Sequence, residues 1–290
     1  MRDARTITGD YFFTEAPRWH NGELWFSDMH GHAVYRTTLS GDATMVAEVS
    51  HDRPSGLGWL PDGRLLVVAM ETQKLLRLEP DGRLVEHADL SQVARGSVND
   101  MIVAADGTAY VGDMGMRLFA GPGERPPGQT IRVTPEGEVS CAADDLLAPN
   151  GHILTDDGHT LIVAESAASR ITAFDVLGDG ALANRRVFAE LTPVSGATQA
   201  PPDGICLDAE GAVWAAEIIG ERLLRVRDGG EVADAIEFDG AVAVACVLGG
   251  DDRRTLLACV AASFHHDVVG AERTSRIEAF AVPVPGAGRP

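Results

Sequence analysis

A short unit recurs six times along the chain, and this repetition constrains the fold more than any other feature of the sequence. Each unit contains an apolar run, a tight turn and a second run rich in β-forming residues, and residues 202–217 are the clearest copy. The turns lie at intervals of 41, 44, 51 and 53 residues, marked by Gly22, Gly63, Gly107, Gly158 and Gly211. A degenerate sixth turn is expected near Asp252 and Arg253.

Third and fourth β-rich runs follow in most units, such as residues 170–174 and 186–189. Four short strands per unit, six times, predict an all-β fold: a six-bladed β-propeller with four-stranded antiparallel blades, forming one domain over residues 1–290. Stacked sandwiches would not need turns of one type at so even a period. We expect residues 1–14 to add a strand to the last blade and close the ring, because a ring must bury its edges.

The net charge and the cysteine content limit which kinds of binding partner and which cellular compartment we expect. The 24 basic and 43 acidic residues give a net charge of −19 without a Lys/Arg cluster, which disfavours nucleic acid and membrane partners and favours a cation or an uncharged small molecule. No apolar segment resembles a signal peptide or reaches the roughly 18 residues of a membrane span. The four cysteines lack metal-ligand spacing, so we interpret them as buried free thiols in a cytoplasmic protein: Cys141, Cys206, Cys246 and Cys259.

Oxygen-bearing side chains begin most of the predicted inner strands. The residues eight before Gly63, Gly107, Gly158 and Gly211 are Ser55, Asn99, Asn150 and Asp203. The first unit is one residue shorter and gives Glu15, and alignment of Leu256 with Leu161 gives Ala245 in the sixth unit. Equivalent positions in equivalent blades lie at equal radius, so we expect these side chains to converge on the axis. Two carboxylates and two amides suit Ca²⁺ best, with Zn²⁺, Mn²⁺ and Mg²⁺ as alternatives. The alternative interpretation is that these Asn and Asp side chains only cap or turn the strands, as they do in many loops.

Acidic residues also end the second strands, and we expect them to hydrogen-bond between blades rather than to attract cations: Asp28, Asp113, Glu165 and Glu217. Asp100 follows Asn99, and strand alternation predicts that it points away from the channel. Three long connections, residues 115–129, 192–202 and 264–274, should crowd the face where the inner strands begin. That face is therefore the expected binding face.

Several motifs, taken together, resemble the senescence marker protein/gluconolactonase/luciferin-regenerating enzyme family over nearly the whole chain: Glu15-Ala-Pro-Arg-Trp19, Val98-Asn99-Asp100, Pro149-Asn150-Gly151, Pro202-Asp203-Gly204 and Leu248-Gly249-Gly250-Asp251. The resemblance implies a six-bladed propeller that hydrolyses lactones. It implies that Glu15, Asn150 and Asp203 bind one divalent metal. It further implies that Asn99 contacts substrate and that Asp203 doubles as the general base.

The chain departs from the sugar lactonases of that family at Ser97, where they carry an arginine that contacts substrate hydroxyls. Arg95 is a candidate replacement. Met101, Met114 and Met116 lie nearby in sequence, which favours either a less polar substrate or ordinary packing. We therefore place Ser97 and Met114 among the substrate-binding candidates.

Histidines flank the same face in two pairs, His30 with His32 and His265 with His266. They either shuttle protons, with His265 reaching the substrate, or remain solvated loop residues. No nucleophile elbow or phosphate-binding glycine loop is present.

These observations predict a divalent-metal-dependent hydrolase that opens a lactone or a small ester, with a small molecule as its partner and its oligomeric state left open. Two alternatives remain. One is an organophosphate hydrolase on the same metal site, and the other is a non-catalytic propeller that binds calcium or another protein.

Overall fold

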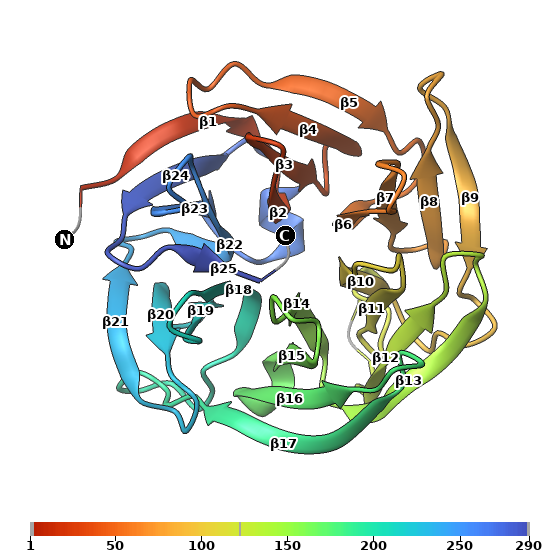
Figure 1. Cartoon of the computed structure of the whole chain (residues 1–290). Coiled ribbons are helices and arrows are strands. Elements are labelled where there is room, and N and C mark those ends of the chain that lie inside the picture. The colour runs from red at the N-terminus through yellow and green to blue at the C-terminus, as the bar shows by residue number, and fades with distance from the viewer. Residues whose placement is uncertain (1–2, 122, 289–290) are drawn as a thin grey trace.

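The structure is a computed structural model that describes residues 3–121 and 123–288, without the side chain of His266. Six antiparallel sheets surround a central axis, as the sequence predicts (Figure 1). Four of the sheets form from chain segments that follow one another in order, and a fifth does so apart from one added strand near the C-terminus. The sixth combines the two ends of the fold.

Strands are numbered along the chain, and the first strand of each blade is the one nearest the axis. Blades one and two are β2 (Thr14–His20), β3 (Glu23–Asp28), β4 (Ala33–Thr37), β5 (Thr44–Glu48), then β6 (Pro54–Trp59), β7 (Leu65–Ala69), β8 (Lys74–Leu78), β9 (Leu84–Asp89). Blades three and four are β10 (Val98–Val103), β11 (Ala109–Asp113), β12 (Gly128–Val133), β13 (Val139–Leu146), then β14 (Pro149–Leu154), β15 (Thr160–Glu165), β16 (Arg170–Val176), β17 (Leu182–Glu190). Blades five and six are β18 (Pro202–Asp208), β19 (Val213–Glu217), β20 (Arg222–Val226), β21 (Val232–Glu237), then β22 (Val242–Gly249), β23 (Thr255–Ala261), β24 (Ser275–Ala281), β1 (Arg5–Tyr11).

Both ends of the chain secure the ring. Strand β1 pairs with β24 as the outermost strand of blade six, which confirms the predicted closure. Strand β25 (Gly286–Ala287) pairs with the end of β18, on the axial side of blade five. The C-terminal segment therefore reaches the centre of the ring at the end opposite the strand heads (Figure 1). Two short helices complete the fold, η1 (Ser166–Ala168) and α1 (His266–Val269).

The turns between first and second strands explain the period of the sequence. In blade three the amide of Gly107 donates to the carbonyl of Ala104 at 3.0 Å, and Gly107 has a φ of 94°, which glycine adopts without strain. In blade six Arg253 takes the corresponding place, with a φ of 55° and a hydrogen bond to the carbonyl of Gly250. This turn is the degenerate sixth copy expected from the sequence.

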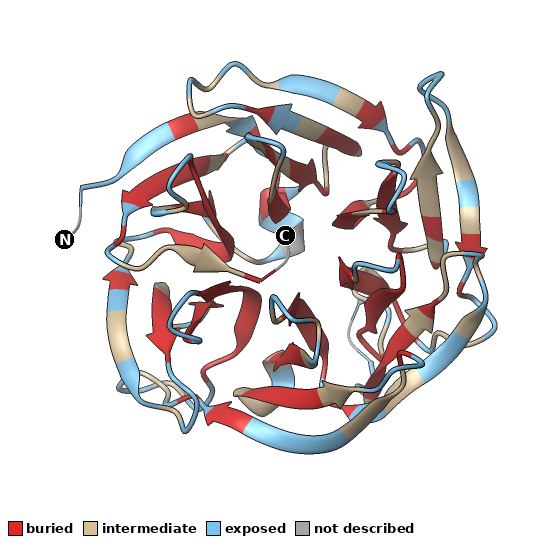
Figure 2. Ribbon diagram, viewed as in Figure 1, coloured by how far each residue is buried: buried red, intermediate tan, exposed pale blue. Residues whose placement is uncertain are grey.

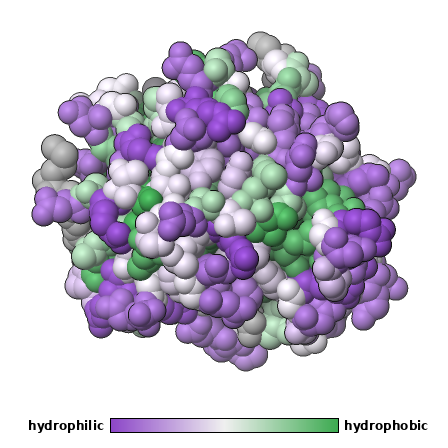
Figure 3. All heavy atoms as spheres, turned by 90° about the horizontal axis from the view of Figure 1, so that it is seen from above, coloured by the Kyte–Doolittle hydropathy of each residue, from purple (hydrophilic) through white to green (hydrophobic). Residues whose placement is uncertain are grey.

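Burial falls from the axis outward. The inner strands are almost wholly buried, whereas most residues of the outermost strands are exposed or intermediate (Figure 2). The side of the ring drawn in Figure 3 is mostly hydrophilic, with one larger hydrophobic patch. Among the described residues, no helix is long and apolar enough to cross a membrane.

The cysteines follow the same gradient. Cys206, Cys246 and Cys259 are buried free thiols, as expected, but Cys141 is exposed. The prediction for Cys141 was wrong because this residue lies on β13, an outermost strand with one side in solvent.

Candidate active site

Each inner strand is irregular just after its first residues, and this irregularity shapes the site. In blade five Pro202 pairs with Glu217 and Ile205 with Ala215, so Asp203 and Gly204 together face a single residue of β19. The other five inner strands carry a register shift at the corresponding place. A bulge re-aims the side chains of a strand, which explains why residues at this position reach the axis.

In three blades the residue after the strand head is a glycine that lies where the next blade approaches closely: Gly56, Gly151 and Gly204. A Cβ atom on Gly204 would be 2.4 Å from the Cβ of Ala245, and one on Gly151 would be 2.7 Å from the carbonyl oxygen of Asp203. Glycine is therefore required there, and it explains the Asn-Gly and Asp-Gly pairs. By register the blade-six equivalent of Asp203 is Ala243 and not Ala245, because Ala245 pairs with Cys259 as Ile205 pairs with Ala215.

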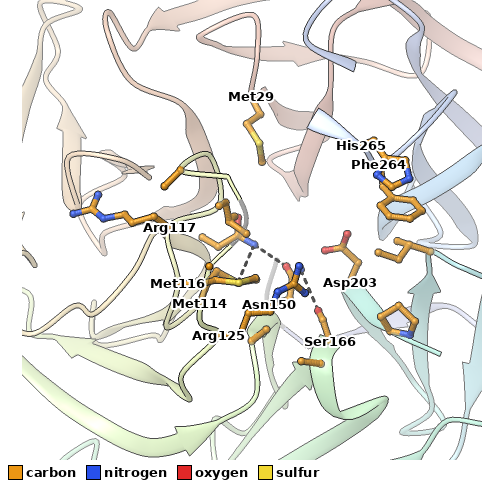
Figure 4. A pocket seen from close by; sticks show the side chains of 18 of the residues that line it. Met29, Met114, Met116, Arg117, Arg125, Asn150, Ser166, Asp203, Phe264 and His265 are labelled. Carbon is orange, nitrogen blue, oxygen red and sulfur yellow. Dashed lines mark hydrogen bonds between the residues drawn. The ribbon is translucent and has the colours of Figure 1, made fainter. Parts of the chain in front are cut away.

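Glu15, Asn99, Asn150 and Asp203 come together at the floor of one cavity of about 710 Å³. Each of the four side chains belongs to a residue that is at most 8% exposed. Met114 and His265 also line this cavity. Asn150 and Asp203 face each other across its floor, with Met114 and Phe264 on opposite sides (Figure 4).

Two serines orient the two amides. The hydroxyl of Ser55 donates to Oδ1 of Asn99 at 2.8 Å, and Nδ2 of Asn99 donates to Oδ1 of Asn150 at 2.9 Å. On the other side, Nδ2 of Asn150 donates to Ser166 at 3.4 Å, and the Ser166 hydroxyl donates to the carbonyl of Pro202 at 2.6 Å. Asn99 thus presents an amino group to the cavity, while the Asn150 oxygen keeps a second lone pair.

Neither carboxylate of the floor forms an ion pair in the described residues, although Arg18 partly offsets the charge of Glu15. Burial, followed by repulsion from Asp100, raises the pKa of Asp203 to about 8, although a hydrogen bond from Asn150 lowers it. Burial, followed by repulsion from Asp203 and Asp100, raises the pKa of Glu15 well above its ordinary value. Within the described chain, Oδ1 of Asp203 is buried without a hydrogen-bond partner. An orphaned oxygen beside a second buried carboxylate fits a bound divalent cation.

A cation site here needs an amide oxygen as its third protein ligand, because the floor has only two carboxylates. No three His, Cys, Asp or Glu side chains in the described residues form a group that could hold a metal ion. Glu15, Asp203 and Asn150 supply two carboxylates and one amide oxygen, and water would complete the coordination of a hard cation. The residues present therefore fit the ion expected from the sequence.

Asp100 points into the channel, contrary to the prediction from strand alternation. Its Oδ1 accepts a 2.6 Å bond from Nη2 of Arg18, which lies on β2, two blades away. Arg18 also donates to the carbonyl of Met101 at 2.6 Å. The prediction was wrong because the bulge turns two successive residues of β10 inward. The buried ion pair fills the channel beneath the floor.

Ser97 and Arg95 do not reach the cavity. Ser97 is fully buried outside the cavity lining, donates to Oε1 of Glu71 at 2.5 Å and accepts from the amide of Leu118. Arg95 instead makes a two-pronged ion pair with Asp144 at 2.6 and 2.8 Å on the exposed side of blade three. Neither side chain lines the cavity in this structure, and a substrate contact by Ser97 stays a prediction.

The histidines have separate environments. His265 is exposed and packs against Phe264, with ring centroids 4.4 Å apart. His32 bonds to the carbonyl of Asp52 at 2.5 Å, and the His30 ring contacts the rings of Phe13 and Phe119. Of the histidines in the described residues, His265 alone lines the cavity, and the side chain of His266 lies outside those residues.

The cavity walls come from the expected long connections and from further residues around the ring. Residues of all three connections line the cavity, among them Met116, Pro201 and Phe264. Sequence patterns alone do not reveal the roles of five further residues: Phe13, Met29, Ile218, Ser166 and Arg18. The apolar or small side chains among them carry no distinguishing pattern, although Arg18 stands inside the Glu15–Trp19 motif.

The second set of acidic residues forms structural hydrogen bonds, but within a blade or to the segment that leads into it and not between blades as expected. Asp113 accepts the amides of Arg95, Gly96 and Gly115 at 2.7–3.0 Å, which ties the entry to β10 to the end of β11. Glu165 pairs with Arg170, and Glu217 pairs with Arg222. Asp28 accepts the amides of Phe12, Phe13 and Gly31.

The fold and the site together define a class of protein. It is a six-bladed β-propeller in which carboxylate and amide oxygens at the heads of the inner strands form the floor of an axial cavity. The sequence model described as SMP-30/Gluconolactonase/LRE-like region matches residues 13–262. The chain therefore belongs to that family, as the motifs suggested.

Individual relatives are distant. Regucalcin of Xenopus laevis is 27% identical over 251 residues, which are 85% of this chain and 82% of the relative. A 6-deoxy-6-sulfogluconolactonase of Pseudomonas putida is 29% identical over 144 residues, 48% of each chain. The solved structure of a regucalcin from Agrobacterium tumefaciens, described as a calcium-binding protein, aligns with a TM-score of 0.82 at 22% identity, covering 100% of this chain and 97% of the other.

Proposed function

We propose that the protein is a divalent-metal-dependent hydrolase that opens a lactone or a small ester. The observation that carries the proposal is the orphaned, buried oxygen of Asp203 beside Glu15 at the floor of a cavity. Burying a carboxylate oxygen without a partner costs free energy, and a bound cation would offset that cost. The family membership supports lactone chemistry, since one relative is named as a lactonase.

Glu15, Asn150 and Asp203 would hold the ion, which when bound polarises a carbonyl oxygen. Asp203 would also take a proton from the attacking water. Asn99 would donate to the substrate the N–H that now faces the sulfur of Met114, because its own oxygen is already occupied by Ser55. A carboxylate next to a cation is a weak base, so strained esters such as lactones suit this arrangement better than amides.

The test uses protein freed of metal with a chelator and then supplied separately with Ca²⁺, Zn²⁺, Mn²⁺ or Mg²⁺. Calcium comes first, because an all-oxygen donor set suits it and the bacterial regucalcin is described as calcium-binding. Acid release from γ- and δ-lactones is followed in a pH-stat. We expect turnover that is lost with chelator and restored by at least one ion. Rates equal to the protein-free background with every ion would refute the proposal.

A further inference from the structure

The walls above the floor are mainly apolar, although the floor itself is polar. Phe13 and Met29 come from blade one, Met114 and Leu118 from blade three, Ile218 from blade five and Phe264 from blade six. Met114 also touches the site directly, with its sulfur 3.9 Å from Nδ2 of Asn99. Apolar side chains therefore surround the axis on several sides immediately above the polar floor (Figure 4).

Several polar groups of the walls are already engaged with the protein. Ser166 donates to the carbonyl of Pro202 at 2.6 Å, and Arg117 donates to the carbonyl of Glu71, also at 2.6 Å. Gln199 donates to the carbonyl of Ala167 at 3.3 Å. A substrate with many hydroxyl groups would lose its hydrogen bonds to water on entering the cavity and find few free hydrogen-bonding groups on these walls. Buried hydroxyl groups without partners oppose binding.

Charged groups remain in the lining, but they are exposed. Glu124 and Arg125 are neighbours of opposite sign, so they add no net charge to the lining, and His265 packs against Phe264. The cavity of about 710 Å³ is within the usual range for pockets that enclose a drug-sized ligand. A lactone ring held at the floor leaves space along the apolar walls.

We propose that the substrate is a lactone whose ring carries an apolar alkyl or aryl substituent, and not a sugar lactone. This inference rests on the proposed lactone hydrolysis and concerns the same site. Asn99 and the ion-binding residues would hold the ring and its carbonyl. The substituent would lie against Met29, Ile218 and Phe264, where contact with apolar walls removes its surface from water.

The test compares kcat/KM for δ-valerolactone, for δ-lactones with progressively longer alkyl chains, for glucono-1,5-lactone and for a lactone bearing a carboxylate. We expect kcat/KM to rise about three- to fourfold per added methylene until the cavity is filled. We also expect glucono-1,5-lactone to fall below δ-valerolactone. A preference for the hydroxylated or the acidic lactone would overturn this inference but leave lactone hydrolysis intact. If no lactone is opened, the proposed function itself fails.

Two wall variants locate the effect. Phe264→Ala and, independently, Ile218→Ala should each lower kcat/KM at least fivefold for the best alkyl lactone, yet less than twofold for δ-valerolactone. Leu177→Ala is the matched control, because Leu177 is 48% exposed outside this cavity. Equal losses on both substrates in both wall variants, or a chain-length dependence unchanged by either, would contradict the assignment.

Discussion

Two sets of acidic side chains occupy repeat-equivalent positions in this propeller, and their surroundings are opposite. Asp113, at the end of a second strand, accepts three backbone amides, and its pair of oxygens is fully used. Asp203, at the head of an inner strand, is also buried but leaves one oxygen without a partner in the described structure. Burial alone therefore does not distinguish a structural acid from a functional one. The hydrogen-bond partners make the distinction.

Exchanging each acid for its amide should separate the two roles most clearly. Asp203→Asn removes the proposed base and an ion ligand, so kcat/KM for a lactone should fall by about 10³-fold or more. The change should not lower the free energy of unfolding of the metal-free protein at pH 8, because it removes an uncompensated buried charge. Kinetics and urea unfolding measure the two effects.

Asp113→Asn is the matched control. It turns an amino group toward backbone amides, so we expect a loss of about 2–4 kcal/mol in the free energy of unfolding. The kcat/KM of the folded fraction should change less than threefold. If Asp203→Asn retained activity with metal bound, or if Asp113→Asn were the variant that lost turnover, the comparison would be reversed.

Stability against pH gives a second contrast. The pKa of Asp203 is about 8 in the folded, metal-free protein and near 4 in an unfolded chain. Between these values the folded state holds a proton that the unfolded state has released, so the free energy of unfolding should fall as pH rises from about 4 to 8. Added calcium should flatten this slope, because it stabilises the ionised form.

Urea titrations at several pH values, with chelator and with calcium, measure this slope. Asp203→Asn should reduce the slope in chelator, whereas Asp113→Asn should leave it in place. A slope of the opposite sign in the metal-free protein would show that the floor carboxylates are already charged and compensated.

Two buried serines form a smaller matched pair. Ser55→Ala frees the Asn99 amide to rotate, so kcat/KM should fall about tenfold, mainly through kcat, and Ser55→Thr should restore part of it. Ser97→Ala breaks a bond to Glu71 outside the cavity and should leave kcat/KM within twofold while lowering stability. Steady-state kinetics of both variants would show whether Ser97 contacts substrate after all.

The smallest effect is expected at His265. This residue is exposed and packs against Phe264, and no hydrogen bond joins it to the floor residues in the described structure, so His265→Ala should change kcat/KM less than threefold and leave the pH–rate profile unchanged. A lost limb of that profile would instead make His265 a proton carrier, as one interpretation of the sequence allows.

The amino-acid sequence determined the number of blades, the closure by residues near the N-terminus and the ring of strand heads. This was possible because a fixed repeat places equivalent residues at equivalent positions around an axis. Glu15, Asn99, Asn150 and Asp203 could therefore be brought to one cavity without coordinates. The turns between first and second strands need a positive φ, which favours glycine, so regularly spaced glycines revealed the period of the repeat.

Only the tertiary structure decided which way side chains point and which of them already have partners. Asp100 turns inward because of a bulge, and it meets Arg18 across two blades, 82 residues away in the chain. Ser97 turns away toward Glu71, and Met29 and Phe264, from the first and last blades, line one cavity. These contacts join residues that are distant in sequence, so local periodicity contains no information about them until the ring closes.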